Sequence, residues 1–127
     1  MKTINWGILG AARVNQRLLP AIEQNPHSKL LVLASRRDGA AQECIHQYSK
    51  YPSEVKASQD FDEVIQHPNI NAIYIPLANE EHTDVALKAI QHKKHVLIEK
   101  PMALTKDEVI QITNTSKKHE VQVMEGF

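Results

Sequence analysis

Cysteine, charge of one sign and long apolar runs are all scarce in this chain of 127 residues. The one cysteine, Cys44, excludes an internal disulfide framework and fits a reducing compartment. Fifteen basic residues balance fifteen acidic ones, so no net charge would steer the chain towards nucleic acid. No apolar run approaches the roughly 20 residues that span a bilayer, and residues 1–3 show no signal-peptide pattern. We therefore expect a cytoplasmic protein with neither a nucleic-acid partner nor a membrane partner.

Apolar segments alternate with helical patterns along the whole chain. The strand-like segments are residues 4–9, 30–34, 72–75 and 96–98, with a weaker one at 121–124 and a short one near Val55. Such runs, separated by helices, are typical of a parallel sheet covered on both faces. Two βαβαβ halves in series predict an α/β protein with a doubly wound parallel sheet, the Rossmann fold. We expect a single domain over residues 1–127.

Helices are expected between these strands. The first should present Val14, Leu18 and Ile22 on one face, and Pro20 should kink or shorten it. The others are expected at residues 40–48, shortly after Asp60, at 80–91 and from Thr105 onwards. The last of these opens with a capping box, T-K-D-E, which is a signature of a helix amino terminus.

A glycine turn follows the first strand. The dinucleotide pattern G-x-G-x-x-G can be laid on Gly10, Ala12 and Asn15, although only the first glycine is present. Gly10 can make the tight turn, and Ala12 is small enough for a pyrophosphate to approach the next helix, whereas Asn15 suits close packing less well. A glycine after a strand is more often simply a turn residue, so the turn alone is weak evidence for a dinucleotide site. Its position in the first βαβ unit strengthens this evidence. The expected cofactor contacts here are Gly10, Ala11, Ala12, Arg13 and Val14.

The second strand ends in Ser35, Arg36 and Arg37, where folds that prefer NAD place a carboxylate on the ribose hydroxyls. A serine hydroxyl and a guanidinium suit a 2′-phosphate instead, because the planar guanidinium donates two parallel charge-assisted hydrogen bonds. We therefore expect NADP as the cofactor, with NAD less favoured. The alternative is a pair of solvated arginines before a turn at Asp38 and Gly39.

The loop that leaves the fourth strand contains further candidates. Pro76, Leu77, Asn79 and His82 are expected near the nicotinamide half of a cofactor, because this loop borders the switch point of the sheet. Asn79 could equally be the amino cap of the following helix, and His82 a partly exposed residue of its first turn. Both alternatives are compatible with a role in binding.

Lys100 stands between Glu99 and Pro101, just past the apolar run 95–98. Open α/β sheets bind ligands in the crevice at the carboxyl ends of their strands. Pro101 fixes its own φ and biases Lys100 towards extended geometry, so the ammonium would leave a constrained backbone. Lys100 is therefore a candidate for catalysis and for cofactor contact, and Glu99 is a candidate to support it.

Four segments in this order resemble the amino-terminal domain of the Gfo/Idh/MocA oxidoreductase family: WGILG at 6–10, ASR at 34–36, the loop 75–82 and KHVLIEKPMALT at 94–105. They are most similar to the NADP-using branch that contains glucose-fructose oxidoreductase, D-xylose dehydrogenase and dihydrodiol dehydrogenase. The resemblance implies hydride transfer between nicotinamide and a sugar, polyol or related hydroxyl or carbonyl substrate. It also implies that Lys100 contacts the substrate and polarises the reacting oxygen.

The resemblance also sets expectations about what lies outside this domain. Family members continue into a carboxyl-terminal substrate domain, which is absent from these 127 residues. We expect this chain alone to bind cofactor without useful turnover, because catalysis needs cofactor and substrate at near-attack distance. Apolar surface near the carboxyl terminus would favour a homo-oligomer. The family usually has glycine where Lys93 stands, and a left-handed lysine would cost roughly 1 kcal/mol, so we expect Lys93 to avoid that geometry.

Other classes of function compete with an oxidoreductase. A non-catalytic nucleotide-binding or interaction module derived from such an enzyme needs no second domain. A methyltransferase using S-adenosylmethionine shares the glycine turn but usually has an acidic residue after the second strand. A metal site is not expected, because no cysteine or carboxylate completes a ligand set with His92 and His95. Cys44 is expected to be a half-buried core residue without a catalytic role.

Overall fold

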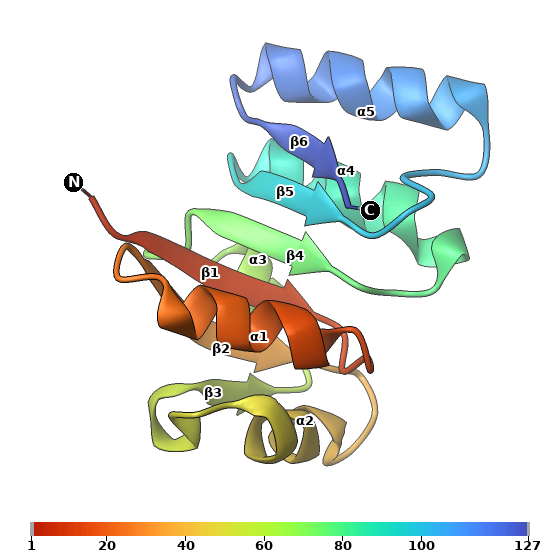
Figure 1. Ribbon diagram of the computed structural model, residues 1–127. Coiled ribbons are helices and arrows are strands. Elements are labelled where there is room, and N and C mark those ends of the chain that lie inside the picture. Colours follow the sequence, from red (N-terminus) through yellow and green to blue (C-terminus); the bar gives the residue numbers. More distant parts are fainter. Residues whose placement is uncertain (1, 127) are drawn as a thin grey trace.

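A six-stranded parallel sheet forms the centre of the computed structural model, which describes residues 2–126 (Figure 1). Its strands are β1 (Ile4–Leu9), β2 (Ser28–Ala34), β3 (Lys56–Ser58), β4 (Ala72–Ile75), β5 (His95–Ile98) and β6 (Val123–Glu125). They lie in the order β3-β2-β1-β4-β5-β6, and all neighbouring strands run parallel. The strand order reverses between β1 and β4, which confirms the predicted doubly wound sheet and its switch point.

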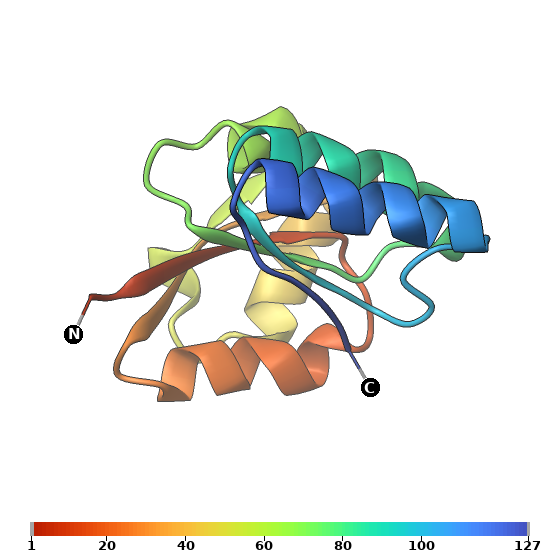
Figure 2. The same cartoon turned by 90° about the horizontal axis from the view of Figure 1, so that it is seen from above.

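Helices cover both faces of this sheet. They are α1 (Asn15–Gln24), α2 (Ala40–Tyr48), α3 (Asp62–Ile65), α4 (His82–Gln91) and α5 (Lys106–Lys118), with short 3₁₀ turns η1 (Pro52–Glu54) and η2 (Asn79–Glu81). Figure 2 shows α1 and α2 on one face and α3, α4 and α5 on the other. No helix within residues 2–126 is long and apolar enough to cross a membrane.

Each face of the sheet packs into its own apolar core. Ile8 and Tyr74 belong to the core under α1 and α2, whereas Leu9, Ile73 and Ile75 belong to the core under α3, α4 and α5. Successive strand residues point to opposite faces, so a strand buried on both sides needs apolar residues at every position. This is why the central strands appear in the sequence as unbroken apolar runs rather than as alternating patterns.

Several element boundaries differ from those predicted, and β5 begins one residue early, at His95. β2 begins at Ser28, because Ser28 and Lys29 continue the parallel pairing with the start of β1. β6 begins at Val123, because the Val121 amide still donates to the Ser116 carbonyl at the end of α5 (3.0 Å). The helix expected at 80–91 begins at His82, after the turn η2.

Two helix signals in the sequence had different outcomes. α1 continues through Pro20 to Gln24, so the proline does not end the helix. Leu19 and Ile22, on either side of Pro20, are buried against the sheet, and this burial offsets the hydrogen bond that proline removes. The capping box of α5 is confirmed: Thr105 Oγ1 accepts from the Glu108 amide and Glu108 Oε1 accepts from the Thr105 amide, both at 3.2 Å.

Lys93 adopts the left-handed geometry that it was expected to avoid, with φ of 62°. Its amide donates to the Ile90 carbonyl (2.8 Å) and the Lys94 amide donates to the Ala89 carbonyl (3.1 Å). These two bonds make a Schellman motif, which places its left-handed residue where Lys93 stands. The expectation was wrong because the helix end and the buried Lys94 fix the backbone between them.

Gly7 lies in the middle of β1, where α3 approaches the sheet closely. A Cβ on residue 7 would stand 2.5 Å from Val64 Cγ1 and 3.0 Å from Ile70 Cδ1. Both neighbours are buried core atoms, so neither can move aside without disturbing the packing. Glycine is therefore needed here for close approach.

Substituting Gly7→Ala is expected to lower the free energy of unfolding by about 2 kcal/mol, because the methyl group overpacks the core. Urea denaturation followed by circular dichroism measures the effect. The matched test is Val64→Ala, which removes the clashing methyl group and alone costs roughly 2 kcal/mol. The double variant should be more stable than the sum of both losses by about 1 kcal/mol or more. Strict additivity would contradict the proposed contact.

Candidate functional site

The loops that follow β1, β2 and β4 meet at one edge of the sheet and enclose a cavity of about 250 Å³, the carboxyl-edge cleft. Its lining residues are Gly10, Ala11, Ser35, Arg36, Arg37, Phe61, Pro76, Leu77, Ala78 and Glu81. Seven residues predicted from three separate stretches of sequence are therefore together: Gly10, Ala11, Ser35, Arg36, Arg37, Pro76 and Leu77. The other predicted site residues, Ala12, Arg13, Val14, Asn79, His82, Glu99 and Lys100, do not line this cavity.

Gly10 makes the turn out of β1 with φ of 127°, a conformation that side chains disfavour. A Cβ here would stand 3.1 Å from Leu77 Cδ2 and 3.2 Å from the Pro76 carbonyl oxygen. The Gly10 amide donates to the Ala34 carbonyl at 2.8 Å, which joins the turn to the end of β2. The bare glycine therefore leaves a narrow space between the first and fourth strand loops.

Asn15 holds this turn from beneath. The residue is fully buried, and its Nδ2 donates to the Gly10 carbonyl (2.9 Å) and to Cys44 Sγ (3.4 Å). Asn15 therefore fits the close packing that the third glycine of the pattern usually allows, because its buried side chain hydrogen-bonds to the turn. An asparagine five residues after the turn glycine, at the place of the third glycine of the pattern, is the sequence signal for this contact.

The backbone between Gly10 and α1 is open to an anion. Arg13 is exposed, and Ala12 and Val14 are half-buried. Among residues 2–126, no acceptor pairs with the amides of Ala12, Arg13 and Val14. Amides before a helix amino terminus, together with the helix dipole, are a general anion-binding arrangement. The turn therefore has the chemistry that a pyrophosphate requires.

The Ser35-Arg36-Arg37 segment is ordered by contacts on both sides. Ser35 is buried, and its Oγ accepts from the Arg37 amide at 3.3 Å. Arg37 Nη2 donates to the Ala11 carbonyl at 3.1 Å, so the second arginine ties the β2 loop to the glycine turn. Arg36 and Arg37 are both exposed, as the alternative of two solvated arginines expects, but Arg37 is also tied to the glycine turn by this hydrogen bond.

Arg36 makes two contacts of a different kind. Its guanidinium carbon lies 4.1 Å from the centre of the Phe61 ring, within the range of a cation–π interaction. Its Nη1 forms an ion pair with Glu81 Oε1. The Arg36 side chain is 59% exposed and that of Glu81 37%, so the charged groups face the cleft and solvent. No local sequence pattern indicates either partner, since each lies far from Arg36 along the chain.

His82 is fully buried, so the alternative of a partly exposed residue in the first turn is wrong. Its Nδ1 lies 2.7 Å from the Pro101 carbonyl oxygen and its Nε2 lies 2.9 Å from the Leu77 carbonyl oxygen. Neither ring nitrogen is left for another ligand. His82 instead joins the β4 loop to the segment that contains Lys100. Asn79 makes no side-chain cap bond at either η2 or α4, so the amino-cap alternative is not found.

Lys100 is exposed at the end of β5 and is followed by a cis peptide bond to Pro101. On one side of the lysine, the Glu99 amide donates to the Ile75 carbonyl (3.2 Å), and Glu99 Oε1 accepts from the Tyr74 hydroxyl (2.5 Å). On the other side, Met102 donates its amide to Glu125 Oε2 (2.7 Å). Because of these hydrogen bonds, the lysine projects from a segment that is held at both ends.

Tyr74 was not predicted to belong to this region. The side chain is buried in β4, and burial, together with the hydrogen bond to and the negative charge of Glu99, raises the pKa of its phenol. The hydroxyl therefore stays protonated and keeps donating to Glu99. A tyrosine in an otherwise apolar strand is the signal for such a contact, because a buried phenol needs a hydrogen-bond partner.

Two other buried polar side chains serve the fold. Cys44 is buried rather than half-buried, and burial raises the pKa of its thiol, which keeps it unreactive. Lys94 Nζ donates to the carbonyls of His67 (2.5 Å) and Ile70 (2.7 Å), and burial lowers the pKa of its ammonium. In residues 2–126, no group of three or more His, Cys, Asp or Glu side chains could hold a metal ion.

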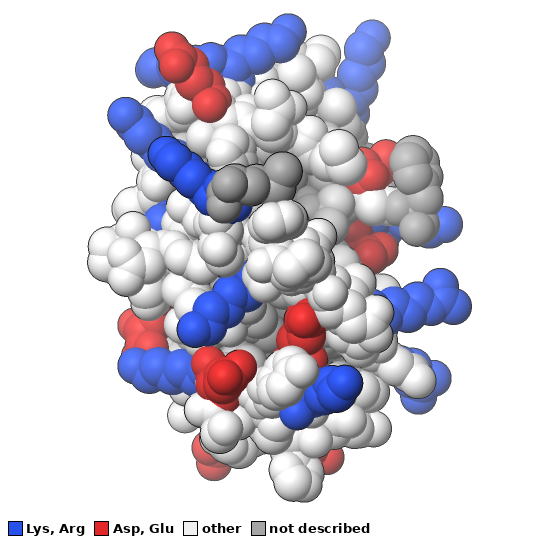
Figure 3. Space-filling model, turned by 60° about the vertical axis from the view of Figure 1, so that its left-hand side comes forward, with Lys and Arg blue, Asp and Glu red and all other residues white. Residues whose placement is uncertain are grey.

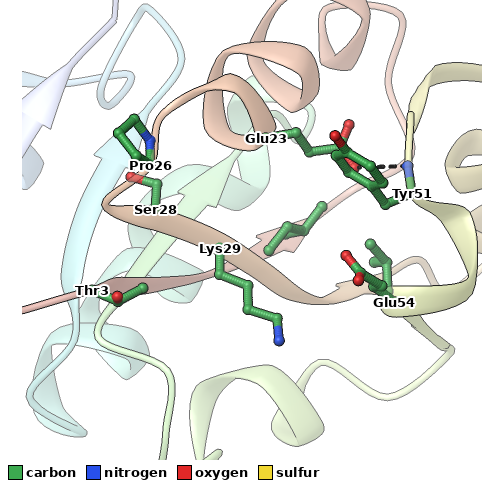
Figure 4. A pocket seen from close by; sticks show the side chains of 9 residues that line it. Thr3, Glu23, Pro26, Ser28, Lys29, Tyr51 and Glu54 are labelled. Carbon is green, nitrogen blue, oxygen red and sulfur yellow. Dashed lines mark hydrogen bonds between the residues drawn. The ribbon is translucent and has the colours of Figure 1, made fainter.

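Hollows other than the carboxyl-edge cleft lie at both ends of the strands. One is lined by Gly39 and Ser58, beyond β2 and at the end of β3, and another lies at the amino ends of β1 and β2. Figure 4 shows the second of these, of about 350 Å³, in which Glu23 accepts from the Tyr51 amide (3.4 Å). The same carboxylate accepts from the Ser49 hydroxyl (2.5 Å) and the Lys50 amide (2.9 Å), so its role there is structural. On the face in Figure 3, basic and acidic side chains are interspersed. The hollow in Figure 4 is lined by none of the predicted site residues.

Comparison with known proteins agrees with this arrangement. The model of the Gfo/Idh/MocA family, described as an oxidoreductase family with an NAD-binding Rossmann fold, matches residues 4–127. A trans-1,2-dihydrobenzene-1,2-diol dehydrogenase of Xenopus tropicalis is 30% identical over 123 residues, which are 96% of this chain and 36% of the relative. A dTDP-3,4-didehydro-2,6-dideoxy-alpha-D-glucose 3-reductase of Saccharopolyspora spinosa is 26% identical over 127 residues, 99% of this chain and 37% of the relative. The chain thus spans little more than a third of these relatives.

Solved structures show the same fold. The 3-ketoreductase KijD10 from Actinomadura kijaniata, in complex with NADP, superposes with a TM-score of 0.89 and 24% identity, over 99% of this chain and 39% of that one. Biliverdin reductase from Synechocystis, in complex with biliverdin and NADP⁺, superposes with a TM-score of 0.86 and 21% identity. The match covers 96% of this chain and 37% of that one.

Proposed function

This chain belongs to the Gfo/Idh/MocA family of oxidoreductases, and we propose that its carboxyl-edge cleft binds NADP in preference to NAD. The observation that carries the proposal is the Ser35-Arg36-Arg37 segment, which brings a hydroxyl and two guanidinium groups to the cleft. No carboxylate stands at the end of β2, where ribose hydroxyls would otherwise be bound. The crystallised relatives that hold NADP support the same choice.

The residues around Gly10 fit a dinucleotide. The space that a Cβ would fill between Gly10, Leu77 and Pro76 is the space needed for a pyrophosphate to approach the backbone. The amides of Ala12, Arg13 and Val14 would donate to its oxygens, while Ser35 and Arg36 would hold the 2′-phosphate. Pro76 and Leu77 would lie along the dinucleotide, with Asn79 nearer its nicotinamide end.

Lys100 is proposed as the catalytic residue of the complete site. The bound nicotinamide supplies a hydride donor or acceptor. The Lys100 ammonium would hold the reacting oxygen of the substrate and stabilise the negative charge that develops on it. Glu99, fixed by the Tyr74 hydroxyl, would orient this segment, and His82 would keep it beside the β4 loop.

The substrate class follows from the relatives, which act on sugar derivatives or on a dihydrodiol by their names. We propose a sugar, polyol or related hydroxyl or carbonyl substrate. Residues 1–127 span 36% of the length of the dihydrodiol dehydrogenase, and we propose that they form the cofactor-binding part of the site. Turnover requires cofactor and substrate to be held together at near-attack distance.

Replacing Arg36 with alanine is expected to weaken NADP binding about 10- to 100-fold, because charge-assisted hydrogen bonds to the phosphate are lost. NAD lacks this phosphate, so its dissociation constant should change no more than about threefold. Calorimetric titration of both cofactors at matched ionic strength measures the difference. Lys118→Ala, which removes an exposed charge at the end of α5, is the control. Equal losses for both cofactors would reject the assignment of Arg36.

A further inference from the structure

A carboxylate reaches the carboxyl-edge cleft from an element that was not expected to supply one. Glu81, at the end of η2, lines the cleft and pairs with Arg36 Nη1. The end of β2 lacks an acidic residue. In the folded chain, however, the carboxylate of Glu81, 45 positions after Arg36, binds the Arg36 guanidinium. The residue proposed to read the 2′-phosphate is therefore already paired with a negative charge.

Arg36 has little freedom to serve both partners. The guanidinium carbon lies over the Phe61 ring, 4.1 Å from its centre, and this contact limits where the group can lie. The N–H groups of a guanidinium all lie in its plane, so they point outward from the edge of that plane. Glu81 occupies part of this edge. A phosphate that takes two parallel bonds from a guanidinium needs two adjacent N–H groups on the same edge.

The negative charges of Glu81 and of the 2′-phosphate strengthen their competition for Arg36. A 2′-phosphate carries close to two negative charges at neutral pH, so a carboxylate beside the same guanidinium repels it. The side chains are partly exposed, which keeps the ion pair weak enough to exchange. The phosphate can therefore displace Glu81 from Arg36, but breaking this ion pair lowers the affinity for NADP. NAD has no 2′-phosphate, so its affinity is not lowered in this way.

We propose that Glu81 is a specificity-determining residue that competes with the 2′-phosphate for Arg36 and so limits the preference for NADP over NAD. The inference rests on the proposed cofactor site. It assigns to this protein a weaker discrimination between the two cofactors than Ser35 and Arg36 alone would give.

The test is Glu81→Gln, which keeps a side chain able to accept from Arg36 and removes the negative charge. Calorimetric titration should show NADP binding about three- to tenfold tighter than in the wild type, with NAD unchanged within about twofold. The matched control is Glu80→Gln, which removes the same charge from the neighbouring exposed residue. That control should leave both dissociation constants within about twofold of the wild type.

A second pair of probes isolates the adenosine half of the site. Adenosine 2′,5′-bisphosphate should gain affinity in Glu81→Gln as NADP does, whereas adenosine 5′-monophosphate should not. Weaker binding of NADP in Glu81→Gln would show that Glu81 holds Arg36 in place for the phosphate and would overturn the proposal, as would unchanged binding or equal gains in both glutamine variants. Failure of the wild type to bind either cofactor would reject the dinucleotide site itself, and the role of Glu81 with it.

Discussion

Replacing Gly10 with alanine is expected to weaken the binding of both NADP and NAD about 100-fold. The backbone at φ of 127° disfavours any side chain, at a cost of about 1–3 kcal/mol. The added methyl group would also press on the Pro76 carbonyl oxygen at 3.2 Å, a backbone atom that cannot rotate away. The turn must shift, and the amides proposed to hold the pyrophosphate shift with it. Loss of two such hydrogen bonds corresponds to about 3 kcal/mol.

The control for this prediction is Gly39→Ala. Gly39 also has a positive φ, 74°, but no atom lies within 4 Å of the added methyl group. The variant therefore carries backbone strain without crowding the cleft, and its cofactor affinity should stay within about threefold of the wild type. Calorimetry measures binding, and thermal unfolding checks that both variants are folded. Equal loss of binding in both variants would attribute the effect to strain alone.

Replacing Lys100 with methionine is expected to lower kcat about 100-fold or more, because the developing negative charge on the reacting oxygen loses its ammonium partner. Methionine keeps most of the length and apolar stem of lysine, so the loop held by Glu99 and Pro101 should remain in place. The dissociation constant for NADP should change no more than about threefold. The expected signature is therefore a loss of turnover without a comparable loss of cofactor binding.

This measurement uses a protein in which residues 1–127 are joined to a substrate-binding domain, because turnover needs cofactor and substrate at near-attack distance. Steady-state reduction of a sugar substrate, followed through NADPH absorbance, reports kcat. Lys106→Met is the matched control, because Lys106 is exposed at the start of α5 and does not line the carboxyl-edge cleft. Wild-type turnover in Lys100→Met would remove Lys100 from the mechanism.

The contacts around Lys100 indicate why a strand end can hold a catalytic group. His82 connects two loops through carbonyl groups on both sides of its ring. Tyr74 and Glu99 add a second connection between β4 and β5. Together these bonds fix the segment more firmly than Pro101 could alone.

The local sequence determined the sheet, its connectivity and the positions of its loops. Apolar runs long enough only for strands, with helical patterns between them, leave few arrangements once the crossovers must be right-handed. For that reason the sequence pattern alone is enough to assign Gly10, Ser35, Arg36 and Pro76 to one edge of the sheet. The family motif ending in Lys100 is equally readable, because it is a contiguous stretch.

Only the tertiary structure decided which partners these residues have. Phe61 and Glu81 meet Arg36, Asn15 supports Gly10, and Tyr74 binds Glu99, across separations of 5 to 45 residues. Such contacts depend on strand register and helix placement, which no local pattern encodes. The same holds for Lys93, whose left-handed backbone is imposed by the helix end and by buried neighbours rather than by its own preference. The sequence thus determined which segments form the cleft. The packing of the chain determined which side chains pair there, because hydrogen bonds and ion pairs form between groups that are close in space.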